Sequence, residues 1–115
     1  MSESNIQKAI LDYLQYQENG IKLWFVRSAS GNISTDTGRR FKTGKKGCPD
    51  IVLCLHGCFI GLEVKTPKGR QSDAQVEAQK IIEACGGKYY VVRSIDDVIK
   101  VLLKERSLLF DKLDN

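Results

Sequence analysis

Two acidic residues and a lysine lie at the ends of two apolar runs in the middle of the chain. Asp50 opens the first run, and Glu63 and Lys65 close the second. The runs are separated by His56-Gly57, which predicts a tight hairpin with a two-residue turn. In the register that such a turn fixes, Asp50 faces Glu63 on the neighbouring strand. The hairpin therefore brings two carboxylates against each other.

Opposed carboxylates repel each other unless a proton, a cation or a divalent metal lies between them. Lys65 lies two residues after Glu63 and therefore on the same face of the strand. A Mg²⁺ ion held by Asp50 and Glu63 would polarise a phosphate and acidify a water, and the Lys65 ammonium would position that water. These residue types predict phosphodiester hydrolysis. An ion-pair cluster at the edge of a sheet is the alternative.

The same register divides the hairpin into two faces of different character. One face is entirely apolar and is expected in the core: Ile51, Leu53, Leu55, Cys58, Ile60, Leu62 and Val64. The other is apolar near the turn and charged at the open end: Asp50, Val52, Cys54, Phe59, Gly61, Glu63 and Lys65. All the ionisable side chains of the two strands thus gather at one end of one face.

Cations are concentrated just before the hairpin. Between positions 27 and 46 there are six cations and one acid, Asp36. Residues 29–47 include four glycines and show no apolar periodicity, so a loop is expected there. A segment of this charge suits a polyanion, with DNA as the expected partner and a solvated basic loop as the alternative. The expected DNA contacts are Arg27, Arg39, Arg40, Lys42, Lys45 and Lys46.

The rest of the chain supplies the elements that must position these residues. Ile6, Ile10, Tyr13 and Leu14 recur at helical spacing, with a capping box expected from Ser4 and Gln7. Residues 22–28 predict a strand. After the hairpin, the pattern predicts a helix from Ser72 to Cys85, a strand at 88–93 and a helix opened by Ser94.

The resulting order, α-β-β-β-α-β-α, predicts an α/β domain of the layered α+β kind, with helices on a mixed central sheet. At 115 residues with 42% apolar residues, the chain is expected to form one domain, 1–115. The segment 107–115 is expected to be a frayed tail or an oligomer contact. No signal peptide or membrane-spanning run is found, so a cytoplasmic location and no membrane partner are expected.

The four cysteines, Cys48, Cys54, Cys58 and Cys85, are expected to be reduced thiols that act as small core hydrophobes. A zinc site built from Cys54, His56 and Cys58, with Cys48, is the alternative. It is disfavoured because the sequence contains no C-x-x-C pair.

The motif residues carry a resemblance to a known family. Pro49-Asp50, a gap of twelve residues and then Glu63-Val64-Lys65 resemble the PD-(D/E)XK nuclease signature. Together with Glu3 on the first helix, Gly47-Cys48 before Pro49, and Gln75 on the next helix, they make the chain similar to the stand-alone VRR-NUC nucleases of phages and bacteria. The resemblance runs from about Glu3 to Ile99.

This resemblance implies roles for individual residues. Asp50, Glu63 and the backbone carbonyl of Val64 would bind the metal, and Lys65 would orient or activate the attacking water. Gln75 would lie beside Lys65 and help to position the water.

Two of the implied residues have simpler interpretations. Glu3, which the resemblance places near the metal, also favours a helix N-terminus electrostatically. Gln75 completes a capping box with Ser72, and Gln71 and Gln79 are rivals for its role.

The resemblance also implies the fold of archaeal Holliday junction resolvases, Mg²⁺ or Mn²⁺ as cofactor, and no small-molecule cofactor. The expected activity is endonucleolytic cleavage of branched DNA, such as Holliday junctions or flaps, by a homodimer in recombination, repair or phage DNA processing. Three alternatives remain: a sequence-specific endonuclease on the same core, a basic nucleic-acid-binding module without catalysis, and a small zinc-bound structural protein.

Overall fold

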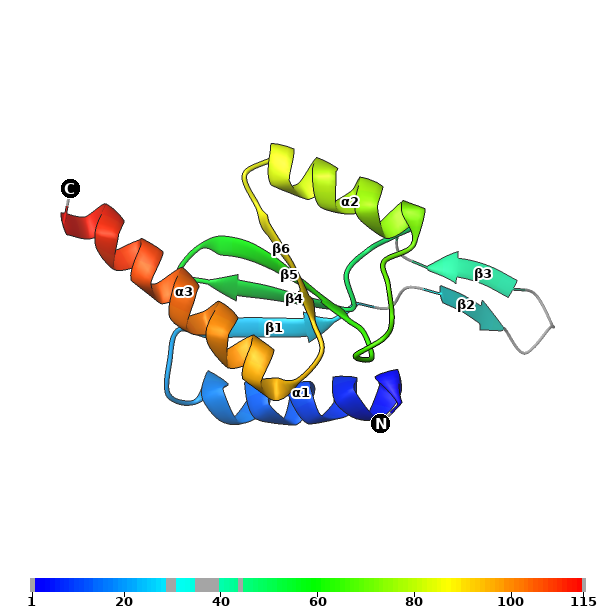
Figure 1. The fold of residues 1–115 in the computed structure, drawn as a ribbon, viewed down its shortest axis with the longest axis horizontal. Coiled ribbons are helices and arrows are strands. Elements are labelled where there is room, and N and C mark those ends of the chain that lie inside the picture. Colours follow the sequence, from blue (N-terminus) through cyan, green and yellow to red (C-terminus); the bar gives the residue numbers. More distant parts are fainter. Residues whose placement is uncertain (1, 29–30, 35–39, 44, 115) are drawn as a thin grey trace.

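The structure is a computed structural model that describes residues 2–28, 31–34, 40–43 and 45–114, without the side chains of 31–34, 40–43 and 110–114. Its elements are three helices and six strands (Figure 1). In chain order they are α1 (Glu3–Glu18), β1 (Leu23–Arg27), β2 (Gly31–Ser34), β3 (Arg40–Thr43), β4 (Ile51–Leu55), β5 (Cys58–Val64), α2 (Asp73–Ala84), β6 (Lys88–Val92) and α3 (Ile95–Asp114).

Four strands form a mixed sheet in the order β1-β4-β5-β6. β4 pairs antiparallel with both β1 and β5, whereas β5 and β6 are parallel and are joined by α2. The predicted class, an α+β domain with a mixed sheet and helices packed on it, is confirmed.

The expected loop over residues 29–47 is wrong at 31–34 and 40–43, which form strands, and the expected element order therefore lacks these two strands. β2 and β3 form a separate antiparallel ribbon in which Gly31 pairs with Thr43 and Ser34 with Arg40. Each strand has only four residues, and the glycine, asparagine and serine in β2 hide any apolar alternation. Backbone pairing, which needs no particular side chains, forms this ribbon.

The predicted hairpin register is confirmed. Leu55 pairs with Cys58 and Val52 with Gly61. His56 and Gly57 both have positive φ, 51° and 80°, as a two-residue turn of the twist-matched type requires. The ladder of pairs therefore leads directly toward Asp50 and Glu63 at the open end.

The hydrophobic core lies between the sheet and the layer formed by α1 and α3 (Figure 1). The aliphatic residues expected on the inner face of the hairpin are all buried. The buried core consists of Ile6, Ile10, Leu14, Leu23, Ile51, Leu53, Leu55, Ile60, Leu62, Val64, Val92, Val98, Val101 and Leu102. α2 lies on the opposite face of the sheet and has no buried residue of its own.

Several local expectations are corrected by the structure. Ser2, not Ser4, caps α1, and its side chain accepts a hydrogen bond from the Asn5 amide at 3.1 Å. Residues 107–114 continue α3 as helix. Among the described residues, no helix is long and apolar enough to cross a membrane.

Of the cysteines expected in the core, Cys58 packs against it, whereas Cys54 and Cys85 do not. Cys54 and Cys85 are exposed, Cys48 and Cys58 are half-buried, and no disulfide joins the four. Cys54 is exposed because it lies on the face of β4 that points away from α1 and α3.

Candidate active site

The segment before β4 is held tightly against the start of α2. Gly47 has φ +79°, and a Cβ built on it would lie 2.2 Å from the Ala74 carbonyl oxygen. Pro49 is buried over Gly61 of β5, where an added Cβ would lie 2.7 Å from the proline ring. Only glycine fits at positions 47 and 61. These close contacts fix the backbone that leads into Asp50.

The Asp50 backbone is fixed from the other side by Ser28. The Ser28 amide donates to the Asp50 carbonyl at 2.8 Å, and its hydroxyl donates to the Pro49 carbonyl at 2.5 Å. The Asp50 side chain turns toward β5, where Oδ2 accepts a hydrogen bond from the Val64 amide at 2.8 Å. Sequence analysis missed Ser28, although the strand register places it opposite Asp50.

Glu63 is the most enclosed residue of the site, with only 1% of its surface exposed. Its Oε1 accepts a hydrogen bond from Gln75 Nε2 at 2.5 Å, and Lys65 Nζ lies 3.8 Å from the same oxygen. Its Oε2 accepts a longer hydrogen bond, 3.4 Å, from the Tyr89 hydroxyl. Both carboxylate oxygens are therefore held in fixed positions.

Burial, and after it the negative charge of Asp50, raise the pKa of Glu63 from 4.5 to about 8, against the opposing effect of Lys65. The two side chains lie at the open end of the paired strands β4 and β5, close enough for the charge of Asp50 to act on Glu63. Without a bound cation, Glu63 therefore carries a proton at neutral pH, next to the Asp50 carboxylate.

Tyr89 was not predicted as part of the site. It pairs with Gly61 in the parallel β5–β6 register and points to the same face as Glu63. Burial and the neighbouring Glu63 raise the pKa of the Tyr89 phenol, so it stays protonated as a hydrogen-bond donor. The strand at 88–93 was expected, but its parallel pairing with β5, which brings Tyr89 to Glu63, could not be read from the sequence.

Gln75 both caps α2 and reaches the candidate site, the two roles that the sequence allowed. Its Oε1 accepts a hydrogen bond from the Ser72 amide at 2.8 Å and completes the capping box of α2. Its Nε2 donates to Glu63 Oε1, the same oxygen that lies 3.8 Å from Lys65 Nζ. The rivals Gln71 and Gln79 are hydrogen-bonded to each other at 3.0 Å. The Gln75 amide thus joins the start of α2 to the acidic pair.

Glu3 is not brought into this cluster by any hydrogen bond or ion pair among the described residues. It lies exposed in the first turn of α1, where it favours the helix N-terminus. Its role near a metal stays a prediction.

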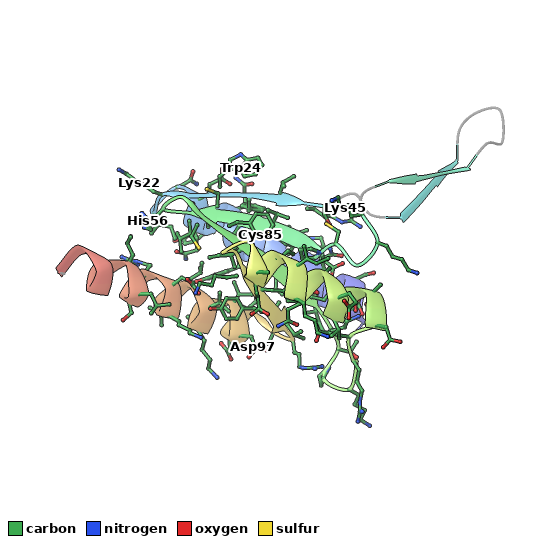
Figure 2. All side chains as sticks on the ribbon, turned by 90° about the horizontal axis from the view of Figure 1, so that it is seen from above. Lys22, Trp24, Lys45, His56, Cys85 and Asp97 are labelled. Carbon is green, nitrogen blue, oxygen red and sulfur yellow. The ribbon has the colours of Figure 1, made fainter. Side chains whose placement is uncertain are left out.

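The predicted DNA contacts are placed unequally. Arg27, Lys45 and Lys46 are exposed, with the two lysines a few residues before Asp50 (Figure 2 labels Lys45). Arg40 and Lys42 belong to β3, but their side chains are not described. Arg39 lies outside the described residues.

A second basic segment, 66–70, follows Lys65 directly. Arg93 Nη1 donates to the Thr66 carbonyl at 2.6 Å and to the Gly69 carbonyl at 2.7 Å, which fastens this turn to the end of β6. The exposed Lys68 and Arg70 lie within it. Lys68 and Arg70 were not among the predicted DNA contacts, because the sequence indicated only a turn between a strand and a helix.

The donor set of the site suits a hard divalent cation. Two carboxylates provide oxygen ligands, and Mg²⁺ commonly uses one or two carboxylates and completes its shell with waters and phosphate oxygens. Within the described part of the chain, no group of three or more His, Cys, Asp or Glu residues could hold a metal. The pair Asp50 and Glu63 therefore fits a site that substrate and water complete better than an all-protein cage.

Comparisons of the sequence add no relative to this description. No protein-family model and no curated protein matches the chain. The resemblance to VRR-NUC nucleases therefore depends on the motif residues. The structure brings four of them together: Asp50, Glu63, Lys65 and Gln75.

Proposed function

We propose that the protein is a divalent-metal-dependent endodeoxyribonuclease, a hydrolase of phosphodiester bonds with a PD-(D/E)XK core of the VRR-NUC kind. One observation carries the proposal. Asp50, bonded to the Val64 amide, and the buried Glu63 meet at the open end of β4 and β5, with the Lys65 ammonium 3.8 Å from Glu63. Burying an acid next to a second acid costs free energy of folding. A bound cation would offset this cost.

The residues of the site divide the work. A Mg²⁺ or Mn²⁺ ion held by Asp50, Glu63 and the Val64 carbonyl would supply positive charge to the phosphate and to the attacking water. Lys65 would orient that water and offset charge in the transition state. The Val64 amide holds Asp50, while Gln75 and Tyr89 hold one oxygen each of Glu63.

The surrounding charge favours DNA as the substrate. The exposed Lys45 and Lys46 precede Asp50 in the chain and the exposed Lys68 and Arg70 follow Lys65, so cations near the site would meet the phosphates of a bound strand. Such contacts read the backbone and not the bases, which favours selection by shape. We therefore propose branched DNA, such as Holliday junctions or flaps, as substrate, cut by a homodimer whose two-fold axis suits paired cuts.

Cleavage of labelled four-way junction, flap, duplex and single-stranded DNA in Mg²⁺, Mn²⁺ or EDTA tests this proposal. Wild type should cut branched DNA with either metal and nothing in EDTA. Replacing Lys65 with alanine should lower the rate at least about 100-fold, because an aimed transition-state charge is lost. Lys8→Ala is the matched control, since this exposed lysine pairs with Asp12 at 2.9 Å on the surface of α1.

DNA that is bound but never cut, under any of these metals, would contradict the nuclease and favour a basic binding module. Cuts at one fixed sequence in every substrate would favour a restriction-type endonuclease on the same core. Cleavage that survives unchanged in Lys65→Ala would remove this lysine from the mechanism.

A further inference from the structure

Half of the sheet face that carries the active site is left uncovered. α2 lies over the β5–β6 side, so β1 and β4 have no helix above them on this face (Figure 1). Four residues form this open face: Trp24 and Val26 on β1, Cys54 on β4 and Phe59 on β5. Trp24 is 58% exposed, Val26 44% and Phe59 42%, and Cys54 is also exposed.

The residues of the open face form one continuous surface. The register places Trp24 opposite Cys54 and Cys54 opposite Phe59, so the three lie in one row across three strands. Two aromatic rings are thus presented on a flat surface with a small side chain between them. In Figure 2 the Trp24 side chain projects from the sheet between the labelled Lys22 and Lys45.

A groove beside this surface runs along α2 to the segment that precedes Asp50. It has a volume of about 560 Å³, within the range of about 300–1,000 Å³ that is usual for ligand sites. Pro49 and Ala74, neighbours of Asp50 and Gln75, line one end, and Phe59 and Ile81 line the other. Phe59 lies four residues before Glu63 on the same face of β5, about 13 Å away at the rise of an extended strand.

The charges around the open face select the class of ligand. Within 22–28 and 45–65 the only acids are the two of the active site, Asp50 and Glu63. The cations of these segments are Lys22, Arg27, Lys45, Lys46 and Lys65.

Lys45 and Lys46 line the groove itself. Asp73 and Glu77 line it on the side of α2, where Glu77 is paired with Lys80 and Asp73 occupies the first turn of the helix.

We propose that the open face and its groove bind unpaired nucleotides of a DNA strand, with bases stacked on Trp24 and Phe59 and phosphates near Lys45 and Lys46. Aromatic rings bordered by cations bind single strands in this way, because every unpaired base offers a planar face. A duplex offers none, since its base faces are already stacked. The inference rests on the proposed nuclease function and narrows its substrate to DNA with a single-stranded segment beside the cut.

The protein itself provides the probe, because Trp24 is its one tryptophan. Titration with short oligo(dT) in EDTA, where no metal-dependent cleavage occurs, should quench the Trp24 fluorescence. A blunt duplex of equal length should leave that fluorescence nearly unchanged. This measurement needs no variant, so it does not depend on the folding of a mutant.

The second arm measures affinity by anisotropy of a labelled strand. Phe59→Leu and Trp24→Leu should each weaken binding of oligo(dT) about 5- to 150-fold, the usual loss for one stacked base. Duplex binding should change less than about twofold. Tyr16→Leu is the matched control, because Tyr16 is an aromatic residue of α1 with 77% exposure and no part in the open face.

Equal affinity of wild type and both variants for oligo(dT) would overturn the inference, even if DNA is cut. A second result would also overturn it. If the Trp24 emission changes with protein concentration alone, and sedimentation shows a dimer that Trp24→Leu dissociates, then a second copy of the chain covers the open face. If no DNA is cut but oligo(dT) quenches Trp24 and Phe59→Leu prevents this, the nuclease proposal fails and the single-strand site stands.

Discussion

A buried glutamate beside an aspartate is the feature on which the proposed chemistry depends. Glu63 is enclosed by Gln75, Tyr89 and Lys65, yet its nearest acidic neighbour is Asp50. The hydrogen bonds from Gln75 and Tyr89 and the lysine at 3.8 Å do not cancel the effect of burial on Glu63. The pKa of Glu63 is still raised to about 8. A proton or a cation must therefore occupy this position.

The raised pKa of Glu63 predicts how the stability of the metal-free protein depends on pH. The folded protein keeps the Glu63 proton up to about pH 8, whereas the unfolded chain loses it near the ordinary value of 4.5. Unfolding therefore releases a proton between these values, and the free energy of unfolding should fall as pH rises through this window. The slope for one proton is at most about 1.4 kcal/mol per pH unit.

Urea unfolding in EDTA at several pH values measures this slope. Glu63→Gln should remove most of the decrease, because the amide cannot titrate. Glu77→Gln, an exposed carboxylate on α2, should keep the wild-type slope. A Glu63→Gln protein with the same slope as wild type would show that another group titrates.

At the residue scale, the sequence was most informative where neighbours are fixed by the hairpin. Asp50, Glu63 and Lys65 could be grouped because a two-residue turn determines their register. Ser28 and Tyr89 were missed because their contacts depend on the pairing of β1 and β6, which no local pattern sets. Only the family resemblance placed Gln75 in the site, beside Lys65, and its hydrogen bond to Glu63 was not predicted.

At the scale of elements, segments with strong hydrophobic periodicity were predicted well, whereas short polar strands were not. The hairpin, α1, α2, the start of α3 and the outer strands β1 and β6 were expected close to their observed positions, whereas α3 continues to Asp114 through the expected tail. The ribbon of β2 and β3 was missed because four-residue strands give too little pattern. The first helix was expected to start at Ser4, but Ser2 offers the same capping chemistry two residues earlier.

The contact between the segment before β4 and the start of α2 predicts that Gly47→Ala is costly. Gly47 and Gly57 have nearly equal positive φ, +79° and +80°, but only at Gly47 would the new Cβ meet another atom, the Ala74 carbonyl oxygen at 2.2 Å. Gly57→Ala should lower the free energy of unfolding by about 1–2 kcal/mol through backbone strain. Gly47→Ala should cost about 1–3 kcal/mol more through overpacking.

Chemical denaturation of both variants gives the difference directly. Because the strain is matched, the excess cost of Gly47→Ala isolates the close packing beside Asp50. Equal destabilisation by the two changes would mean that this packing is looser than the structure shows.

At the scale of the whole molecule, the two faces of the sheet have separate tasks. α1 and α3 cover one face and form the core, whereas the other face carries α2, the acidic pair and the open face. The ribbon of β2 and β3 and the far end of α3 project at opposite ends of the molecule (Figure 1). A substrate that lies along the second face would meet the active site and the aromatic residues together.

The most direct test of the central claim, that Asp50 and Glu63 hold a divalent cation, is calorimetric titration of the metal-free protein with Mn²⁺. We expect saturable binding to wild type and a loss of at least about tenfold in affinity for Asp50→Asn and for Glu63→Gln, since loss of residues outside the coordination shell already costs about 10–100-fold. Asp12→Asn is the control, because this exposed carboxylate pairs with Lys8 on α1 at 2.9 Å. Binding that is equal in wild type and all three variants would contradict the metal site and the nuclease built upon it.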